Sequence, residues 1–519
     1  MSYSQAWLDN TNNVRCILVV AKAYSIVGAA EVTFYLSNKG FITADALTVF
    51  TPVLIAGPTF SESISIDSNI SISYGDLEIS NVDGDYDDWL DSTKYVWANK
   101  QIQVYFGGPD FTSASAATLA TEFDLVFDGL ISDVDSRNKD VVNIKFRDKM
   151  EKLNTPVTEN KLGAYGTWAG GQQNQDSIKP LIFGEAHNYE PLLVDPAQLQ
   201  FMFNDGACEQ LVEIRDNGVP IYTIVTLLGQ AVVNNTTGMF TLTKPLVGTC
   251  TVSTQGVKKS INLTTGALTS TYTNTIANAI AVIVTQYGKT GFKLTTSELD
   301  LPNFSAFNTA NSQSIGVVIT DRVNVLNLAR QILSGVGAQL FFTRKGKLQI
   351  LQIGIPTSDP SVAIDSTNMV DNTFAISSRT PVLSSTKIGY AKNWLVQQNL
   401  TTSIPAQHKN LFEEEWLTTT VTDSSVASLY SQAAEPVMIE TPLILTSEAV
   451  TEATRRNNFT KVARTFYSFT GTSSLLSLKL GQPVTVTYNR FGLDAGKSGQ
   501  VTRLQPDFYK GTVQIEVLI

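Results

Sequence analysis

The feature that most constrains the fold is strand-patterned sequence near both ends of the chain, with helical periodicity mainly between them. In Ser61–Ile66 and Ile70–Tyr74 isoleucine alternates with serine, and this period of two places isoleucine on one face of a strand. About seven turn-bounded strands in the first 155 residues predict a barrel or sandwich. Further strands are expected at Arg15–Ala21, Val32–Leu36, Ile102–Phe106, Phe123–Val134, Val141–Arg147, Val462–Phe469, Pro483–Tyr488, Gln500–Pro506 and Thr512–Ile519.

Helical patterning marks the middle of the chain. Apolar residues recur every three or four positions in Thr271–Tyr287 and in Asp321–Val336, and Gly288 follows the first pattern at a typical helix stop. Strand patterns at Gln339–Thr343 and Lys347–Ile353 follow the second helix at once. The sequence therefore predicts a helix that runs into a hairpin, which is an α+β unit. One more helix is expected in the last 160 residues, at about Ser447–Lys461.

The length of 519 residues suggests three or four domains. We interpret the polar loop Gly163–Gln175 as a domain junction and Asp216-Asn217-Gly218 as a hairpin turn. The expected fold class is mainly β with an α+β central part, in several domains, two of them barrel-like β-domains near the chain ends. The expected domains are an N-terminal β-barrel-like domain at 1–160, a small β-domain and junction at 161–262, an α+β domain at 263–370, and a C-terminal β-domain with one helix at 371–519.

Composition excludes several classes of protein. Charged residues make up only 16% of the chain and the net charge is −10, so the basic footprint of a nucleic-acid binder is missing. Solubility depends instead on 43 serines and 58 threonines, and threonine suits β-structure. Apolar runs such as Ala279–Val284 are far shorter than the ~20 residues of a membrane helix. The first residues lack the basic start and apolar core of a secretory signal.

The cysteines and histidines are few. Cys16, Cys208 and Cys250 lie far apart and are odd in number, which argues against a disulfide framework or a zinc ribbon. We expect buried, reduced thiols in a chain that folds in a cytoplasm. The sequence contains no G-x-S-x-G motif that would supply a nucleophilic serine to pair with His187. We therefore expect His187 to be structural or exposed.

Each cluster that could carry chemistry has a simpler structural interpretation. The acidic segment Asn81–Asp91 fails the calcium-loop spacing, so it predicts a turn into a short helix with Trp89 and Leu90. Glu413-Glu414-Glu415-Trp416 is interpreted as an exposed charge run, because adjacent residues point in different directions. Arg344, Lys345 and Lys347 around Gly346 are interpreted as a solvated hairpin tip. Gly107-Gly108-Pro109 and Gly170-Gly171 predict turns. We therefore expect no catalytic, cofactor-binding or metal-binding residues, no cofactor and no enzymatic activity.

Several short segments occur in a characteristic order along the chain: Ser73–Ile79 with Asn81–Gly84 and Trp89-Leu90, Phe127-Asp128-Gly129, Arg147–Leu153, Gly335–Ala338, Arg344–Leu348, Gly389–Trp394, Glu452–Arg456 and Arg490–Leu493. In this order they resemble the baseplate hub (tail tip) proteins of tailed bacteriophages. The resemblance covers most of the chain, and we expect no attached peptidase or lysozyme-like module.

The resemblance implies a structural virion protein at the tail tip, assembled in the host cytoplasm. Three copies would form a ring with two barrel-like domains each, joining the sixfold tail to the threefold tip. Its implied partners are the distal tail protein ring, the tape measure protein and central fibre or tip proteins, with no nucleic acid bound directly and no membrane span. Two alternatives stay open: a receptor- or glycan-binding adhesin, and a polysaccharide-degrading enzyme whose carboxylates come from separate strands.

Overall fold

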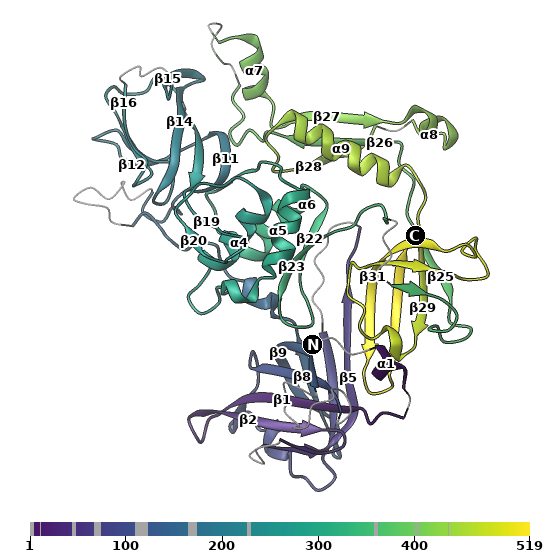
Figure 1. Ribbon diagram of the computed structural model, residues 1–519. Coiled ribbons are helices and arrows are strands. Elements are labelled where there is room, and N and C mark those ends of the chain that lie inside the picture. The colour runs from purple at the N-terminus through teal and green to yellow at the C-terminus, as the bar shows by residue number, and fades with distance from the viewer. Residues whose placement is uncertain are drawn as a thin grey trace.

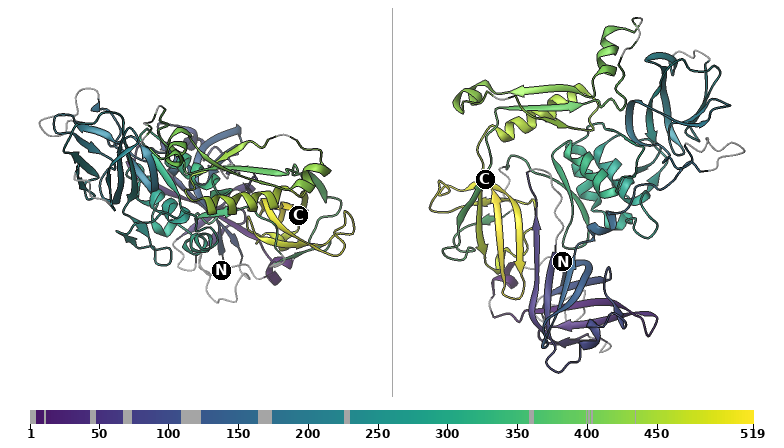
Figure 2. Two further views of the ribbon diagram at one scale, coloured as in Figure 1. Left: turned by 90° about the horizontal axis from the view of Figure 1, so that it is seen from above. Right: turned by 180° about the vertical axis from the view of Figure 1, so that it is seen from behind.

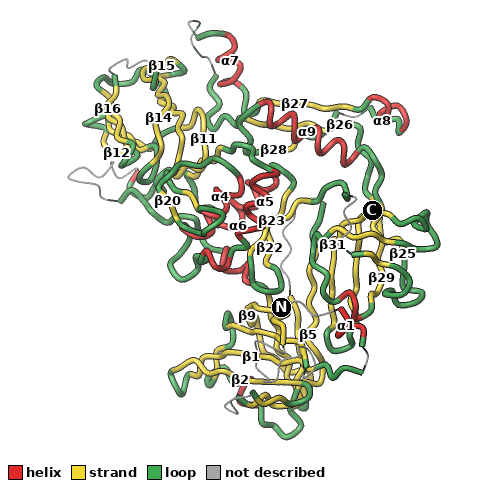
Figure 3. The backbone as a smooth tube through the Cα atoms, in the orientation of Figure 1, coloured by secondary structure: helices red, strands yellow, loops and turns green. Residues whose placement is uncertain are grey.

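Strands dominate a body built from several sheets, with helices in the middle and along one side (Figure 1, Figure 3). The computed structural model describes residues 5–10, 12–43, 48–66, 74–108, 123–163, 174–225, 230–357, 362–398, 400, 402, 404–433 and 435–519. The expected strand at residues 70–73, the centre of the junction loop at 164–173, Pro109 and Gly170-Gly171 lie outside these residues. The mainly β, multidomain class that the sequence predicts is confirmed.

The N-terminal β-region forms the lower part of the molecule in Figure 1. Its strands pair mainly with antiparallel neighbours, and Ile, Leu, Val and Phe side chains on their inner faces form one core. Its elements are β1 (Cys16–Ser25), β2 (Ala30–Ser37), β3 (Phe41–Ile42), β4 (Val49–Pro52), β5 (Leu54–Ser63), β6 (Tyr74–Ser80), β7 (Tyr95–Val96), β8 (Gln101–Gly107), β9 (Phe123–Asn138) and β10 (Val141–Arg147), with 3-10 turns at Asp87–Leu90 and Lys149–Leu153. The short helix α1 (Gln5–Asp9) precedes them and contacts the 3-10 turn Ser473–Leu475 of the C-terminal β-region.

A smaller β-region follows the junction loop. The turn expected at Asp216-Asn217-Gly218 is confirmed: Asn217 and Gly218 have φ values of 49° and 84°, as a tight hairpin turn requires. Its strands are β11 (Leu181–Tyr189), β12 (Leu192–Asp195), β13 (Gln200–Met202), β14 (Cys208–Asp216), β15 (Val219–Thr223), β16 (Ala231–Asn234), β17 (Met239–Leu242) and β18 (Cys250–Val257).

The central α+β part contains the predicted helix–hairpin unit. The apolar faces of α4 and α6 pack together around Ile280, Ile283 and Leu328, all fully buried or nearly so. The elements are β19 (Ser260–Ile261), β20 (Leu268–Thr269), α4 (Ile276–Gln286), α5 (Leu301–Ala310), β21 (Gly316–Ile319), α6 (Val325–Ser334), β22 (Ala338–Phe342) and β23 (Leu348–Gln352). The sequence analysis missed α5, whose weak amphipathic pattern begins with Leu301 and Pro302 after the Asp300 cap.

The last third of the chain has two parts. One is an arm along the top of Figure 1, in which α9 packs on a three-stranded sheet: β26 (Ser385–Tyr390), α7 (Ala406–Glu413), β27 (Leu417–Thr422), α8 (Ser424–Leu429), β28 (Met438–Glu440) and α9 (Thr446–Thr460). The expectation of a single helix here is wrong, because α7 and α8 are too short to show helical periodicity. The other part is the C-terminal β-region: β24 (Ala363–Ile364), β25 (Ala375–Arg379), β29 (Thr465–Gly471), β30 (Pro483–Val486), β31 (Lys497–Asp507) and β32 (Thr512–Leu518).

Several pairings cross the expected domain boundaries. β21 pairs with β11, so the sheet of the small β-region continues into the central part. Ile388, Leu443 and Ala453 of the arm belong to the core that surrounds α4 and α6. The four domains proposed from the sequence therefore stay a prediction, and the arrangement is better followed from the contacts between regions.

Candidate functional site

The two ends of the chain meet in one continuous sheet. β31 pairs antiparallel with β5, and the partners are Arg503 with Ser63, Leu504 with Glu62, and Asp507 with Thr59. Because β5 also pairs with β6, the strand order runs from the C-terminal β-region into the N-terminal one, and the described strands of this sheet number 16. Views from front and behind both show the C-terminal strands beside β5 (Figure 1, Figure 2).

Aromatic side chains pack across this first contact between the two terminal β-regions. Phe508, which is buried, follows β31 and places its ring 5.8 Å from the ring of Phe60 and 5.0 Å from that of Phe106. Gly57 lies so close to the same turn that an added Cβ would be less than 3.0 Å from the Cβ of Tyr509. Both terminal β-regions consequently share one hydrophobic core.

The tip of the β22–β23 hairpin makes the second contact, at the point where three regions meet. Arg344 Nε lies 3.1 Å from Glu62 Oε2 on β5, and its Nη2 donates to the Leu478 carbonyl at 2.6 Å. The Arg344 carbonyl accepts from the Asp128 amide on β9 at 2.7 Å. One residue of the central part thus contacts both terminal β-regions.

Two further ion pairs flank Arg344. Lys345 Nζ contacts both carboxylate oxygens of Asp124, at 2.8 and 2.9 Å, and Lys149 Nζ lies 2.7 Å from Asp128 Oδ2. Gly346 has a φ of 69°, and a Cβ there would lie 2.7 Å from Asp128 Oδ2, so the tip requires glycine.

The sequence interpretation of a solvated tip is wrong for Arg344. Its side chain is 14% exposed, because β5 and the Leu476–Leu480 segment cover it, whereas the side chain of Lys345 is 51% exposed. Lys347 is exposed as expected. The sequence could not show this difference, because the covering residues lie far away along the chain.

Glu62 is the most constrained charge at this contact. Burial raises the pKa of the Glu62 carboxyl, and the Arg344 guanidinium acts against that shift by lowering it. A buried carboxylate of this kind depends on its cationic neighbour for compensation.

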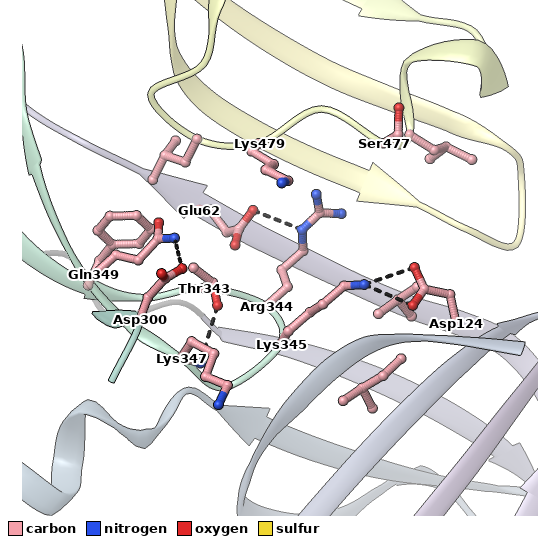
Figure 4. Close-up of a pocket in the computed structure, with 15 residues that line it drawn as sticks. Glu62, Asp124, Asp300, Thr343, Arg344, Lys345, Lys347, Gln349, Ser477 and Lys479 are labelled. Atoms are coloured by element: carbon pink, nitrogen blue, oxygen red, sulfur yellow. Dashed lines mark hydrogen bonds and ion pairs between the residues drawn. The ribbon is translucent and has the colours of Figure 1, made fainter. Parts of the chain in front are cut away.

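A cavity of about 420 Å³ opens between the three regions beside these ion pairs (Figure 4). Glu62 and Asp124 come from the N-terminal β-region, Thr343–Gln349 from the hairpin tip, and Leu476–Leu480 from the C-terminal β-region. It has the size of a small-molecule site. The sequence does not predict this cavity, since no two of its three walls are close along the chain.

A third set of charges fixes α9 to the end of α6. Glu452, which is fully buried, accepts from Arg455 Nε and Nη2 at 2.7 Å and from Arg456 Nε at 2.6 Å. Arg455 Nη2 also donates to the Val336 carbonyl at 3.0 Å, and Arg456 Nη2 donates to the Ser334 carbonyl. The two arginines therefore satisfy carbonyls at the C-terminus of α6, where the helix dipole favours cations.

The other clusters singled out from the sequence have structural roles. In Asn81–Asp91 the predicted turn and short helix are confirmed: Asn81 Nδ2 donates to Asp87 Oδ1 at 2.8 Å, and Trp89 is buried in the 3-10 turn. The run Glu413–Glu415 is exposed, as expected. His187 is part-exposed and lies 3.3 Å from Glu185 Oε1.

The three cysteines are buried and unpaired, as the sequence predicts. Burial raises the pKa of Cys16 to about 11 and the pKa values of Cys208 and Cys250 to about 12, so thiolate is scarce at neutral pH. Within the described residues, no three His, Cys, Asp or Glu side chains are grouped so that they could hold a metal ion. No helix in that part of the chain is long and apolar enough to span a membrane.

No known protein family and no curated protein matches the sequence. Among solved structures, the 43 kDa tail protein of prophage MuSo2 from Shewanella oneidensis is 12% identical, with a TM-score of 0.39 over 97% of this chain and 98% of that one. A tail protein from Neisseria meningitidis MC58 is 9% identical, with a TM-score of 0.36 over 97% and 96%. A chain of a gene transfer agent virion is 10% identical, with a TM-score of 0.42 over 71% and 91%.

Two of these structural neighbours are tail proteins, one of them from a prophage, and the third belongs to a virion, which agrees with the phage-tail resemblance of the sequence. With TM-scores below 0.5, the matches assign no role to any residue of this chain.

Proposed function

We propose that this chain is a structural virion protein, the baseplate hub at the tip of a phage tail, and that it carries out no catalysis. In this proposal three copies form a ring that joins the sixfold tail to the threefold tip. The distal tail protein ring, the tape measure protein and central fibre or tip proteins are its partners, and assembly takes place in the host cytoplasm.

One observation carries the proposal: the pairing of β31 with β5 places the two terminal β-regions side by side in every copy. Three such copies around an axis would supply six β-regions, which a sixfold ring can meet in register. The sequence resemblance points to the same arrangement.

The arm offers a surface for contact between copies. At its end, marked by α8, Leu429 is 77% exposed and Tyr430 is also exposed. Val437, directly before β28, is 89% exposed. Neighbouring exposed apolar side chains of this kind are typical of assembly surfaces.

The test is the mass and shape of the purified full-length chain. A particle of three times the 56.4 kDa chain mass, seen as a ring with six β-regions at roughly 60° steps, supports the proposal. Leu429→Asp should shift the particle toward monomer, while Val247→Asp, also at an exposed position but in the small β-region, should not. A wild-type monomer across the micromolar range would refute the ring.

Two other functions are distinguished by adding polysaccharide-cleavage and glycan-binding assays to the mass measurement. A monomer that cleaves a polysaccharide would support an enzyme, and a particle that binds host glycans without forming a ring would support an adhesin. No observation on the described residues favours either over the hub.

A further inference from the structure

The cavity between the three regions has apolar walls. Leu125 and Val126 of β9, Phe341 of β22, and Leu476 and Leu480 of the C-terminal β-region line it. Four of these five side chains carry little or no exposed surface, so the walls are held by the surrounding core. Cavities of about 420 Å³ with mostly apolar walls and a few polar groups are typical of ligand sites.

The acidic groups of the cavity are already engaged. Glu62 pairs with Arg344, and Asp124 accepts from Lys345 through both oxygens. Asp300 accepts from the Asn303 amide at 3.2 Å and from Gln349 Nε2 at 2.6 Å. Glu62 and Asp124 are therefore each balanced by a cation, whereas Asp300 accepts only from neutral groups and Glu62 Oε2 accepts no hydrogen bond from the described residues.

Two donors, by contrast, have no acceptor among the described residues. Within the described part of the chain, Lys479 Nζ has no hydrogen-bond or ion-pair partner, and Arg344 Nη1 has no acceptor. Arg344 Nη2 donates to the Leu478 carbonyl, and Nε forms the ion pair with Glu62. Figure 4 shows the Lys479 ammonium directed to the same side as the Arg344 guanidinium. Four cationic side chains line the cavity against three acidic ones, which leaves one positive charge.

We propose that this cavity binds an apolar group that carries one carboxylate. The apolar part would lie against the leucine and phenylalanine walls, and the carboxylate would accept from Lys479 Nζ and Arg344 Nη1. One negative charge matches the net charge of the lining, which has four cationic and three acidic side chains. The carboxyl terminus of a peptide and a free aliphatic acid share this chemistry.

A bound ligand would contact all three regions at once. Because it would bind the folded arrangement and not the unfolded chain, it would also stabilise that arrangement. This inference does not depend on the proposed ring, since the cavity lies within one copy.

The test uses the full-length protein and three probes in isothermal titration calorimetry. N-acetyl-phenylalanine carries both features, N-acetyl-phenylalaninamide lacks the carboxylate, and acetate lacks the apolar part. We expect saturable binding of the first and at least about tenfold weaker binding of the other two, because each lacks one of the two contacts and a hydrogen bond to a charged group is strong. Hexanoate, measured beside the first probe, distinguishes an aliphatic acid from a peptide terminus.

Two variants make the test specific. Lys479→Gln should weaken binding of N-acetyl-phenylalanine about tenfold without changing stability, because the ammonium has no partner among the described residues. Lys497→Gln, an exposed lysine on β31 outside the cavity, should change neither. Equal binding of acid and amide, equal affinity in the two variants, or no saturable binding of either acid would overturn the proposal.

Discussion

The two contacts that join the regions of this molecule differ in kind. The terminal β-regions meet through backbone pairing of β31 with β5 and through the buried Phe508 ring. The central part meets both of them at the hairpin tip, where Arg344 pairs with the buried Glu62. Backbone hydrogen bonds tolerate most changes of side chain, whereas a buried ion pair fails when either partner is lost. The first contact should therefore be sensitive to shape and the second to charge.

The largest effect is expected at the buried charge cluster of α9. Glu452→Gln removes the carboxylate that holds Arg455 and Arg456, and burial already lowers the pKa of the Arg456 guanidinium. Removing one partner of a buried ion pair leaves the other charge uncompensated. We therefore expect the free energy of unfolding, measured in urea, to fall by about 4 kcal/mol. Asn458→Ala, at an exposed position on the same helix, is the control. Its free energy of unfolding should stay within about 0.5 kcal/mol of the wild-type value. Equal effects of the two changes would contradict a charge-dependent contact.

Much of the fold could be predicted from local periodicity. The helices α4, α6 and α9 and the hairpin after α6 follow from apolar spacing, and the Asn217-Gly218 turn follows from its residue types. The contacts could not be predicted in this way. Glu62 and Arg344 are far apart in a single sequence, and only the fold brings them within 3.1 Å. At Glu452 the i, i+3 and i, i+4 spacing to two arginines was a local signal, though it could not show the burial.

The second effect concerns the hairpin tip. Arg344→Met leaves Glu62 buried without its cation. We expect the free energy of unfolding to fall by about 3 kcal/mol at neutral pH. Burial raises the pKa of Glu62 above its ordinary value of 4.5, so the protonated form is favoured on folding. The loss should therefore shrink as the pH falls toward 4.5 and grow as the pH rises. Urea unfolding at several pH values checks this, and the double variant with Glu62→Leu should recover most of the loss.

The third-largest effect is expected at the contact between the terminal β-regions, where a change of side-chain size tests how closely β5 packs against the turn after β31. Gly57→Ala would place a Cβ less than 3.0 Å from the Cβ of Tyr509, so the turn after β31 must move. The free energy of unfolding should fall by about 1–3 kcal/mol, and this loss should not depend on pH or salt. Gly354→Ala is the matched control, because nothing lies within 4 Å of its added Cβ and its φ is not positive. A loss at Gly57 that varied with pH would remove the distinction between the two contacts.

The smallest effect is expected at Lys345, the neighbour of Arg344 in the same hairpin tip. Lys345 pairs with Asp124 at 2.8 Å. The Asp124 side chain is 8% exposed but that of Lys345 is 51% exposed, so water reaches the ion pair from the lysine side and competes for the ammonium. Exposed ion pairs contribute about 0–1 kcal/mol and weaken with salt. Lys345→Met should therefore cost less than about 1 kcal/mol in dilute buffer and nothing measurable at about 1 M sodium chloride, while the loss from Arg344→Met should persist there. Arg344 and Lys345 are adjacent in the sequence, and their different effects on stability would then follow from the greater burial of Arg344. Equal losses in the free energy of unfolding at both positions in high salt would show that something other than the buried ion pair stabilises the tip.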